Sequence, residues 1–245
     1  MKKRNTLAAI FLFFCLLMPN FVLAASIERT STLNLSELDL SLNHEDADEG
    51  WKWDASQNTL TLNNVNFNVP ISSNGIIFPS NKDVTVEVIG ENTISATVPL
   101  ARSGALNSEN VIITGTGNLT LTTKNEKATT DLVNLTINSG NVIAINGSVN
   151  VIQKVKVNGG SLSVNTMNIS DNGWPDGIYA LEGVEVTNGK VDLNVKRVGM
   201  YVSGTKNSTS TDGIIITGGE VNINAGLAAM YVGNDDEIPV IRKDV

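Results

Sequence analysis

Two short runs of alternating apolar and polar residues, Val184–Val186 and Val191–Val195, are joined by the pair Asn188-Gly189. In each run the apolar residues fall at every second position, which is typical of a β-strand that buries one face. Asn-Gly is a pair that readily takes positive φ. The sequence therefore predicts two strands with a sharp corner between them.

The same unit recurs along most of the chain, which indicates an internal repeat. Each copy is a short apolar run, a glycine and a second run that alternates apolar with polar residues. The other copies are Val111–Ile113 with Gly117, Leu135–Ile137 with Gly140, Val155–Val157 with Gly160, and Ile214–Ile216 with Gly219. Together with Gly189, these glycines are 23, 20, 29 and 30 residues apart, a spacing typical of one solenoid coil per repeat.

The repeats predict an all-β protein, a right-handed parallel β-helix (β-solenoid) with coils of about 20–30 residues. A single coil cannot bury its apolar side, whereas stacked coils share one core and pair their backbones. We expect the β-helix to span residues 58–232, after a signal peptide at 1–25 and a capping segment at 26–57. The tail, residues 233–245, is expected either to fold back as a lid or to lead into a longer protein.

The first 25 residues have the pattern of a secretory signal peptide: three basic residues at 2–4, an apolar run, and small residues at Ala24-Ala25. The apolar run is too short for a membrane span. We therefore expect a protein that is secreted or held at the cell surface, with no membrane span. Cys15 lies within this segment, so the mature chain would contain no disulfide.

The chain is acidic, with 17 Lys and Arg residues against 25 Asp and Glu residues and a net charge of −8. The signal segment holds three of the basic residues and none of the acidic ones, so its removal moves the net charge to −11. Such a chain is repelled by phosphate, which argues against nucleic acid as a partner.

Four motifs resemble those of a known family. They are Gly50-Trp-Lys-Trp-Asp54, Thr59-Leu-Thr-Leu62, the stretch Val86–Ile94 that ends in Gly-Glu-Asn-Thr-Ile, and Ile113–Leu121. The chain from about Gly50 to Val232 is similar to a family of secreted bacterial β-helix proteins described as carbohydrate-binding domains. Some members bind cellulose and pectin-like polysaccharide in a calcium-dependent way. The resemblance implies a β-helix that binds polysaccharide, and its motifs are structural rather than catalytic.

Three later segments are expected to form a further side of the coils: Gly177–Ala180, Gly199–Val202 and Ala229–Val232. If Ile178, Met200 and Met230 face the core, alternation turns the neighbouring tyrosines outward in one column. These are Tyr179, Tyr201 and Tyr231. Two interpretations remain open for them: a stacking surface for sugar rings, or a ladder that stiffens the sheet.

Short polar side chains are expected to form columns on another face, after the turn glycines. The outward positions are Ser95 and Thr97, Thr120 and Thr122, Ser163 and Asn165, Asp192 and Asn194, Asn222 and Asn224. Such columns suit the hydroxyl groups of a glycan, and they equally suit any solvated face of a soluble solenoid.

An irregular segment, Ile169–Gly177, interrupts the repeats and gathers Asp171, Trp174 and Asp176. We expect Trp174 to join the tyrosines in ligand binding, and Asp171 and Asp176 to hold Ca²⁺, a cation that takes oxygen ligands. Ordinary turn chemistry is the alternative.

Near the N-terminal end of the repeats, Trp51 and Trp53 offer a sugar platform or a plug for the core, and we expect at least one to be a plug.

These observations favour a secreted, non-catalytic protein that binds an extended cellulose-like or pectin-like polysaccharide, with calcium as a candidate cofactor. An adhesin or structural solenoid that binds a protein or host matrix is the alternative. A polysaccharide lyase or hydrolase is disfavoured because the one histidine, His44, lies outside the repeats and no nucleophile motif is present. The sequence gives no oligomeric state.

Overall fold

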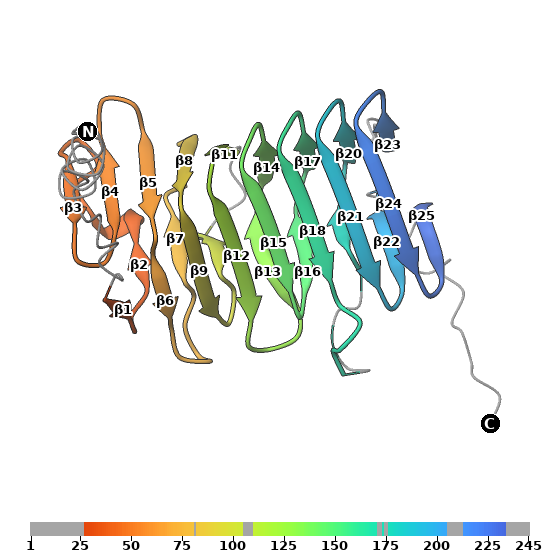
Figure 1. The fold of residues 1–245 in the computed structure, drawn as a ribbon, viewed down its shortest axis with the longest axis horizontal. Helices are drawn as coiled ribbons and strands as arrows, with labels where there is room; N and C mark the ends of the chain where they lie inside the picture. The colour runs from red at the N-terminus through yellow and green to blue at the C-terminus, as the bar shows by residue number, and fades with distance from the viewer. Residues whose placement is uncertain are drawn as a thin grey trace, which may run out of the picture.

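The protein is a right-handed β-solenoid in the computed structural model, which describes residues 27–80, 82–104, 110–170, 173, 176–204 and 213–233. Its strands stack side by side in three sheets that run the length of the molecule (Figure 1). In Figure 1 the chain advances from left to right as it winds, with the N-terminal coils on the left. The predicted fold class is confirmed.

Sheet A contains β1 (Glu28–Arg29), β6 (Asn66–Asn68), β9 (Glu91–Ala96), β12 (Asn118–Thr123), β15 (Asn141–Ile145), β18 (Ser161–Asn165), β21 (Lys190–Val195) and β24 (Glu220–Ala225), in this spatial order. Sheet B contains β2 (Leu33–Asn34), β7 (Ile76–Phe78), β10 (Leu100–Arg102), β13 (Ala128–Leu132), β16 (Ser148–Val151), β19 (Ile178–Ala180), β22 (Val198–Val202) and β25 (Ala228–Val232). Sheet C contains β3 (His44–Asp46), β4 (Trp51–Asp54), β5 (Thr59–Asn63), β8 (Val84–Ile89), β11 (Asn110–Gly115), β14 (Asn134–Ile137), β17 (Lys154–Val157), β20 (Gly183–Val186) and β23 (Gly213–Ile216). One 3₁₀ turn, η1, covers Leu35–Glu37.

Each coil supplies one strand to sheet C, then one to sheet A and one to sheet B, and pairs in parallel with the coils on either side. In sheet A, for example, Leu162 pairs with Val142 on one side and Val191 on the other. Because the pairing is one to one, side chains of the same kind meet along the axis of the solenoid. The predicted strands Val184–Val186 and Val191–Val195 fall within β20 and β21.

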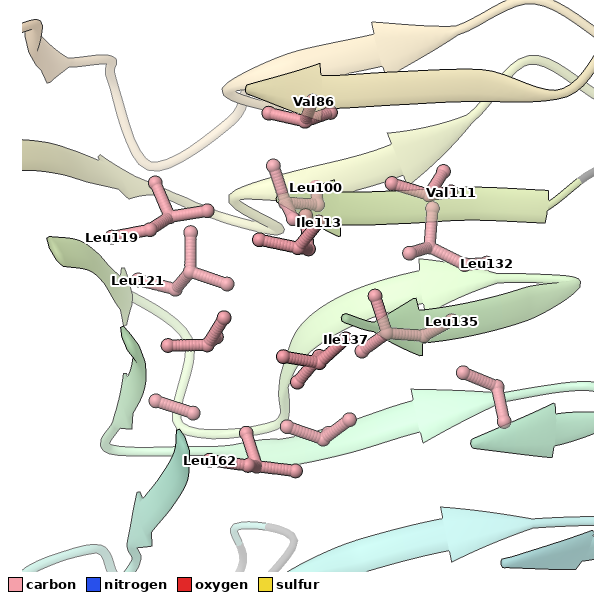
Figure 2. Close-up of a cluster of buried hydrophobic side chains, with 14 of the residues drawn as sticks. Val86, Leu100, Val111, Ile113, Leu119, Leu121, Leu132, Leu135, Ile137 and Leu162 are labelled. Atoms are coloured by element: carbon pink, nitrogen blue, oxygen red, sulfur yellow. The ribbon is translucent and has the colours of Figure 1, made fainter. Parts of the chain in front are cut away.

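The core fills the space between the three sheets. Figure 2 shows side chains from several coils pointing into this space, among them Val86, Leu119 and Ile137, which are fully buried. Leu, Ile and Val dominate the core, because every second residue of each strand faces inward. At about 25 cal/mol per Å² of buried apolar surface, this shared core is the main source of stability.

The N-terminal end of the solenoid is closed by an antiparallel element. β3 pairs with β4, and β4 with β5, in antiparallel fashion, whereas β5 pairs in parallel with β8. Trp53 is fully buried and donates a hydrogen bond from its indole nitrogen to the Leu40 carbonyl oxygen. The prediction that a tryptophan plugs this end of the core is confirmed.

The segment before residue 58 also takes part in the sheets themselves. β1 and β2 pair in parallel with β6 and β7, so this segment extends sheets A and B as well as covering the end. Leu33 and Leu35 are buried, Leu33 from strand β2 and Leu35 from the 3₁₀ turn.

Candidate functional site

The three tyrosines form one column on the outer side of sheet B. Tyr179 on β19 pairs with Tyr201 on β22, which pairs with Tyr231 on β25. The ring centroids of Tyr179 and Tyr201 are 5.2 Å apart, and those of Tyr201 and Tyr231 are 5.4 Å apart. The parallel register thus brings together three residues that lie 22 and 30 positions apart in the sequence.

The column packs edge to face, and its central ring is inaccessible. The interplanar angles are 79° and 63°, so the rings do not form one flat surface. Tyr201 is 0% exposed, and the Arg197 guanidinium lies 5.9 Å from its ring centroid. Tyr179 and Tyr231 are half-buried. Tyr201 therefore acts in this conformation as a packing residue between two partly accessible rings.

The Asp176 carboxylate is buried and forms an ion pair with the partly exposed guanidinium of Arg197. Its two carboxylate oxygens accept hydrogen bonds from Nε and Nη2 of Arg197 at 2.8 and 2.5 Å, and Oδ1 also accepts from the Val198 backbone N–H at 3.1 Å. A bidentate pair of this kind fixes both side chains. Asp176 thus anchors the end of the irregular segment to the next coil.

The other predicted ligands in this segment, Asp171 and Trp174, lie outside the described residues. Within the described ranges, no group of three or more His, Cys, Asp or Glu side chains is placed to hold a metal ion. Calcium binding by Asp171 and Asp176 stays a prediction. A cation at Asp176 would share the carboxylate with the Arg197 guanidinium, because Arg197 and Val198 already use three of its roughly four acceptor positions.

The irregular segment is tied by Glu126 to the coil two before its own, the coil that contains β12 and β13. This residue has a φ of 57°, and its Oε2 accepts a hydrogen bond from the Ser170 backbone N–H at 2.8 Å. Hydrogen bonding from Ser170 lowers the pKa of the Glu126 carboxyl. Lys196 donates a hydrogen bond to the Ile169 carbonyl oxygen from the following coil. The segment is therefore held from both sides along the axis.

A shallow groove of about 570 Å³ lies on the outer side of sheet A. It crosses β15, β18, β21 and β24, so its long direction follows the stack of coils. The lining side chains that point outward are Ile143, Ser163, Asn165, Asp192, Asn194, Asn222 and Asn224. Successive coils contribute equivalent positions at about 4.8 Å intervals.

Hydrogen bonds along the axis hold these side chains in place. Asn222 donates from Nδ2 to Oδ1 of Asp192 at 2.8 Å, and Asn224 donates to Oδ1 of Asn194 at 2.8 Å. Lys190 lies 3.1 Å from Oδ2 of Asp192. The hydrogen bond from Asn222, assisted by Lys190, lowers the pKa of Asp192, so this carboxylate is ionised at neutral pH.

The groove can offer both donors and acceptors to a ligand. A carboxamide has two N–H donors and one acceptor oxygen, so the bond that Asn224 donates to Asn194 does not exhaust either amide. Asn222 uses both donors, on Asp192 and on Glu220, and offers its acceptor oxygen. Most of the outward groups are uncharged, and Ile143 adds apolar surface at the edge of the polar columns. Such a surface is suited to a ligand rich in hydroxyl groups.

Sequence reasoning placed the polar residues of this groove outward and in columns, and the structure confirms that arrangement; Ile143 was not part of that prediction. It did not single them out as a site, because short polar residues are also ordinary solvated strand residues. The signal available in the sequence was the repeated pair of polar residues at positions i and i+2, three times in succession: Ser163 with Asn165, Asp192 with Asn194, and Asn222 with Asn224.

Comparison with known proteins adds no assignment: no protein family model, curated protein or solved structure matches the chain. Among the described residues, no helix is long and apolar enough to cross a membrane.

Proposed function

We propose that the protein is a secreted, non-catalytic binding protein for an extended polysaccharide, which lies along the groove on sheet A. The observation that carries this proposal is the column geometry of the groove, in which equivalent short polar side chains recur coil after coil on a parallel sheet. A polymer with a repeating pattern of hydroxyl groups matches a surface with a repeating pattern of donors and acceptors. The resemblance to carbohydrate-binding β-helix proteins supports the same class of ligand.

The rigidity of the groove favours binding of a long, extended chain. Asn194 and Asn222 lie on strands that are paired on both sides or held by ladder hydrogen bonds, so little side-chain freedom remains to be lost. Ile143 gives the C–H face of a sugar ring an apolar contact next to these amides. The held amides lower the cost of ordering the complex, and the contact with Ile143 adds buried apolar surface.

The charges near the groove favour a neutral, cellulose-like polymer over a free polyuronate. Asp192 lies in the groove and is ionised, Glu220 lies at the start of β24, and Lys190 pairs with both, which leaves one net negative charge here. A pectin-like chain carries carboxylates that these groups repel. Calcium bridging the carboxylates of protein and polymer would remove that repulsion, and this is the place of calcium in the proposal.

The tyrosine column is the second location for the same ligand. Tyr179 and Tyr231 are half-buried and offer limited stacking surface, while Tyr201 would have to become uncovered first. The two locations are on different sheets, so variants that change the outer side of one sheet at a time distinguish between them.

The test is affinity electrophoresis and pull-down of the mature chain with cellulose, a neutral soluble glucan and a pectin-like polyuronate, each with calcium and with chelator. We expect binding to neutral polymer in both conditions and to polyuronate only with calcium. The triple variant N165A/N194A/N224A should weaken binding at least tenfold, since it removes three amides from one column. A Thr120→Ala/Thr122→Ala variant is the matched control, because it alters the same sheet outside the groove.

Three outcomes would change the proposal. Unchanged binding by the triple variant, with loss in Tyr179→Ala/Tyr231→Ala, would move the site to sheet B. Binding of polyuronate with chelator present would contradict the role given to charge. Absence of binding to every polysaccharide would remove the proposal in favour of an adhesin or structural solenoid.

A further inference from the structure

The two ends of the solenoid differ in how they are finished. At the N-terminal end, β3 and β4 close sheet C with antiparallel strands and bury Trp53 over the core. At the other end of the described chain, β23, β24 and β25 are the terminal strands of their sheets. Each of them has a pairing partner on one side only, as β1, β2 and β3 have at the other end, so a row of backbone N–H and C=O groups faces outward along the axis.

The inward side chains of this last coil are exposed, although they occupy core positions. Met230 is 41% exposed, whereas its register partner Met200 is 0% exposed. Val232 is 52% exposed and its partner Val202 is 0% exposed. Ile216 is similarly accessible, and the other inward residues are only partly buried: Ile214, Val221, Ile223 and Ala225. This end is therefore a contiguous apolar surface surrounded by open strand edges.

We propose that this end, formed by Gly213–Val232, is the interface of a tail-to-tail dimer with a second copy of the chain. All the inward residues of the coil are apolar, so the surface can meet itself without burying a charge. A two-fold axis across the solenoid axis reverses strand direction, and the two open edges can then pair in antiparallel fashion.

The closed N-terminal end makes this assembly finite. Head-to-tail stacking would set this exposed apolar end against the N-terminal end, where the core is already covered: Leu33, Leu35 and Trp53 are buried there, and β3 and β4 run antiparallel to their neighbours. The last coil has 20 residues, at the lower limit of the roughly 20–30 residues that each side of a standard interface contributes. The contact surface therefore suits an isologous dimer and not a filament.

The test is light scattering after size exclusion, over a range of concentrations, on the mature chain. We expect twice the monomer mass, and small-angle scattering should give a particle about twice as long as the monomer. The variant Met230→Lys/Val232→Lys should be a monomer with an unchanged fold by circular dichroism, because both side chains are open to solvent before association. Ile71→Lys, at a residue 64% exposed in a corner elsewhere, is the control and should stay a dimer.

A wild-type monomer at every concentration would overturn the proposal. A dimer that survives both lysines would place the contact on another surface. A monomeric wild type that is destabilised by the two lysines would show that residues of the same chain cover this end. The groove and this end share β24, but the groove uses the outward side chains Asn222 and Asn224 whereas the interface uses inward ones, so different variants test the two proposals.

Discussion

At the scale of single residues, Asn92 shows how one polar side chain is accommodated in an apolar core. It is 2% exposed and pairs in register with Leu119, so it occupies a position where the next coil has leucine. Its Oδ1 accepts a hydrogen bond from the Val65 N–H at 3.0 Å, and its Nδ2 donates to the Ile89 and Asn118 carbonyl oxygens, each at 3.1 Å. The amide therefore satisfies backbone groups of three successive coils.

Replacing Asn92 with leucine should destabilise the protein even though the column would become uniformly apolar. The Val65 N–H would lose its partner in a buried place, which costs about 1–3 kcal/mol. Urea unfolding would measure the loss in unfolding free energy, provided that the m-value is unchanged. Asn141→Leu, on the exposed side of sheet A, is the control, and we expect it to change stability by about 0.5 kcal/mol or less. An Asn92→Leu variant with an unchanged free energy of unfolding would show that these hydrogen bonds make no net contribution to stability.

Tyr201 marks the limit of prediction from sequence at this scale. Alternation along the strand correctly placed the three tyrosines in one column, because side-chain direction is a local property of the backbone. It could not give the burial of Tyr201, which depends on its two neighbouring rings and on Arg197. Asp176 is a similar case, since its partner Arg197 is 21 residues away and meets it only through the stacking of coils.

At the scale of elements, the corner between sheets C and A depends on a column of glycines. Gly160, Gly189 and Gly219 all have positive φ, and a Cβ on each would approach the carbonyl oxygen of the glycine one coil earlier within 2.2–2.6 Å. Two requirements therefore coincide at each corner: a left-handed backbone and the absence of a side chain. The sequence revealed this corner because both requirements select the same residue.

Gly189→Ala should be strongly destabilising for both reasons. The left-handed conformation costs about 1–2 kcal/mol for an alanine, and the contact at 2.6 Å with the Gly160 oxygen adds to it. Gly104→Ala is the matched control, with a φ of 92° and no atom within 4 Å of the added Cβ. The difference between the two melting temperatures measures the steric part alone. Equal effects of the two substitutions would show that the corners can relax.

The groove on sheet A could be anticipated only in part at this scale. The polar pairs were visible in the sequence, but their alignment across coils depends on how many residues each corner absorbs. The coil from Gly160 to Gly189 is nine residues longer than the one from Gly140 to Gly160, yet β15, β18 and β21 remain in one-to-one register. Nothing local to the strands specifies that result.

At the scale of the whole molecule, each coil contacts mainly its neighbours, so stability should vary along the axis. The N-terminal end is covered by β3 and β4, the middle coils have partners on both sides, and β23–β25 have partners on one side. The fold was predictable at this scale because every repeat carries the same pattern. The closure of the N-terminal end by antiparallel strands depends on pairings that no repeat encodes.

Hydrogen exchange should therefore show a gradient along the solenoid in the monomeric Met230→Lys/Val232→Lys variant. We expect amides of β23–β25 to exchange fastest and those of β11–β16 slowest, because opening a terminal coil breaks contacts on one side only. Mass spectrometry of peptides from each coil would measure the gradient. Uniform protection over all coils would indicate a single cooperative unit instead.

The coils differ in length only at their corners, and this affects how such a chain can change during evolution. The strands of sheet A keep their register although the connection from β18 to β19 is long, with its segment held by Glu126 and Lys196. Insertions at this corner, or duplication of a whole coil, would leave the stacking of the remaining coils intact. Deletion of a single residue within a strand would instead shift every later side chain of that strand to the opposite face. Descendants of this sequence should accordingly differ in corner length and in number of coils, while strand length stays constant.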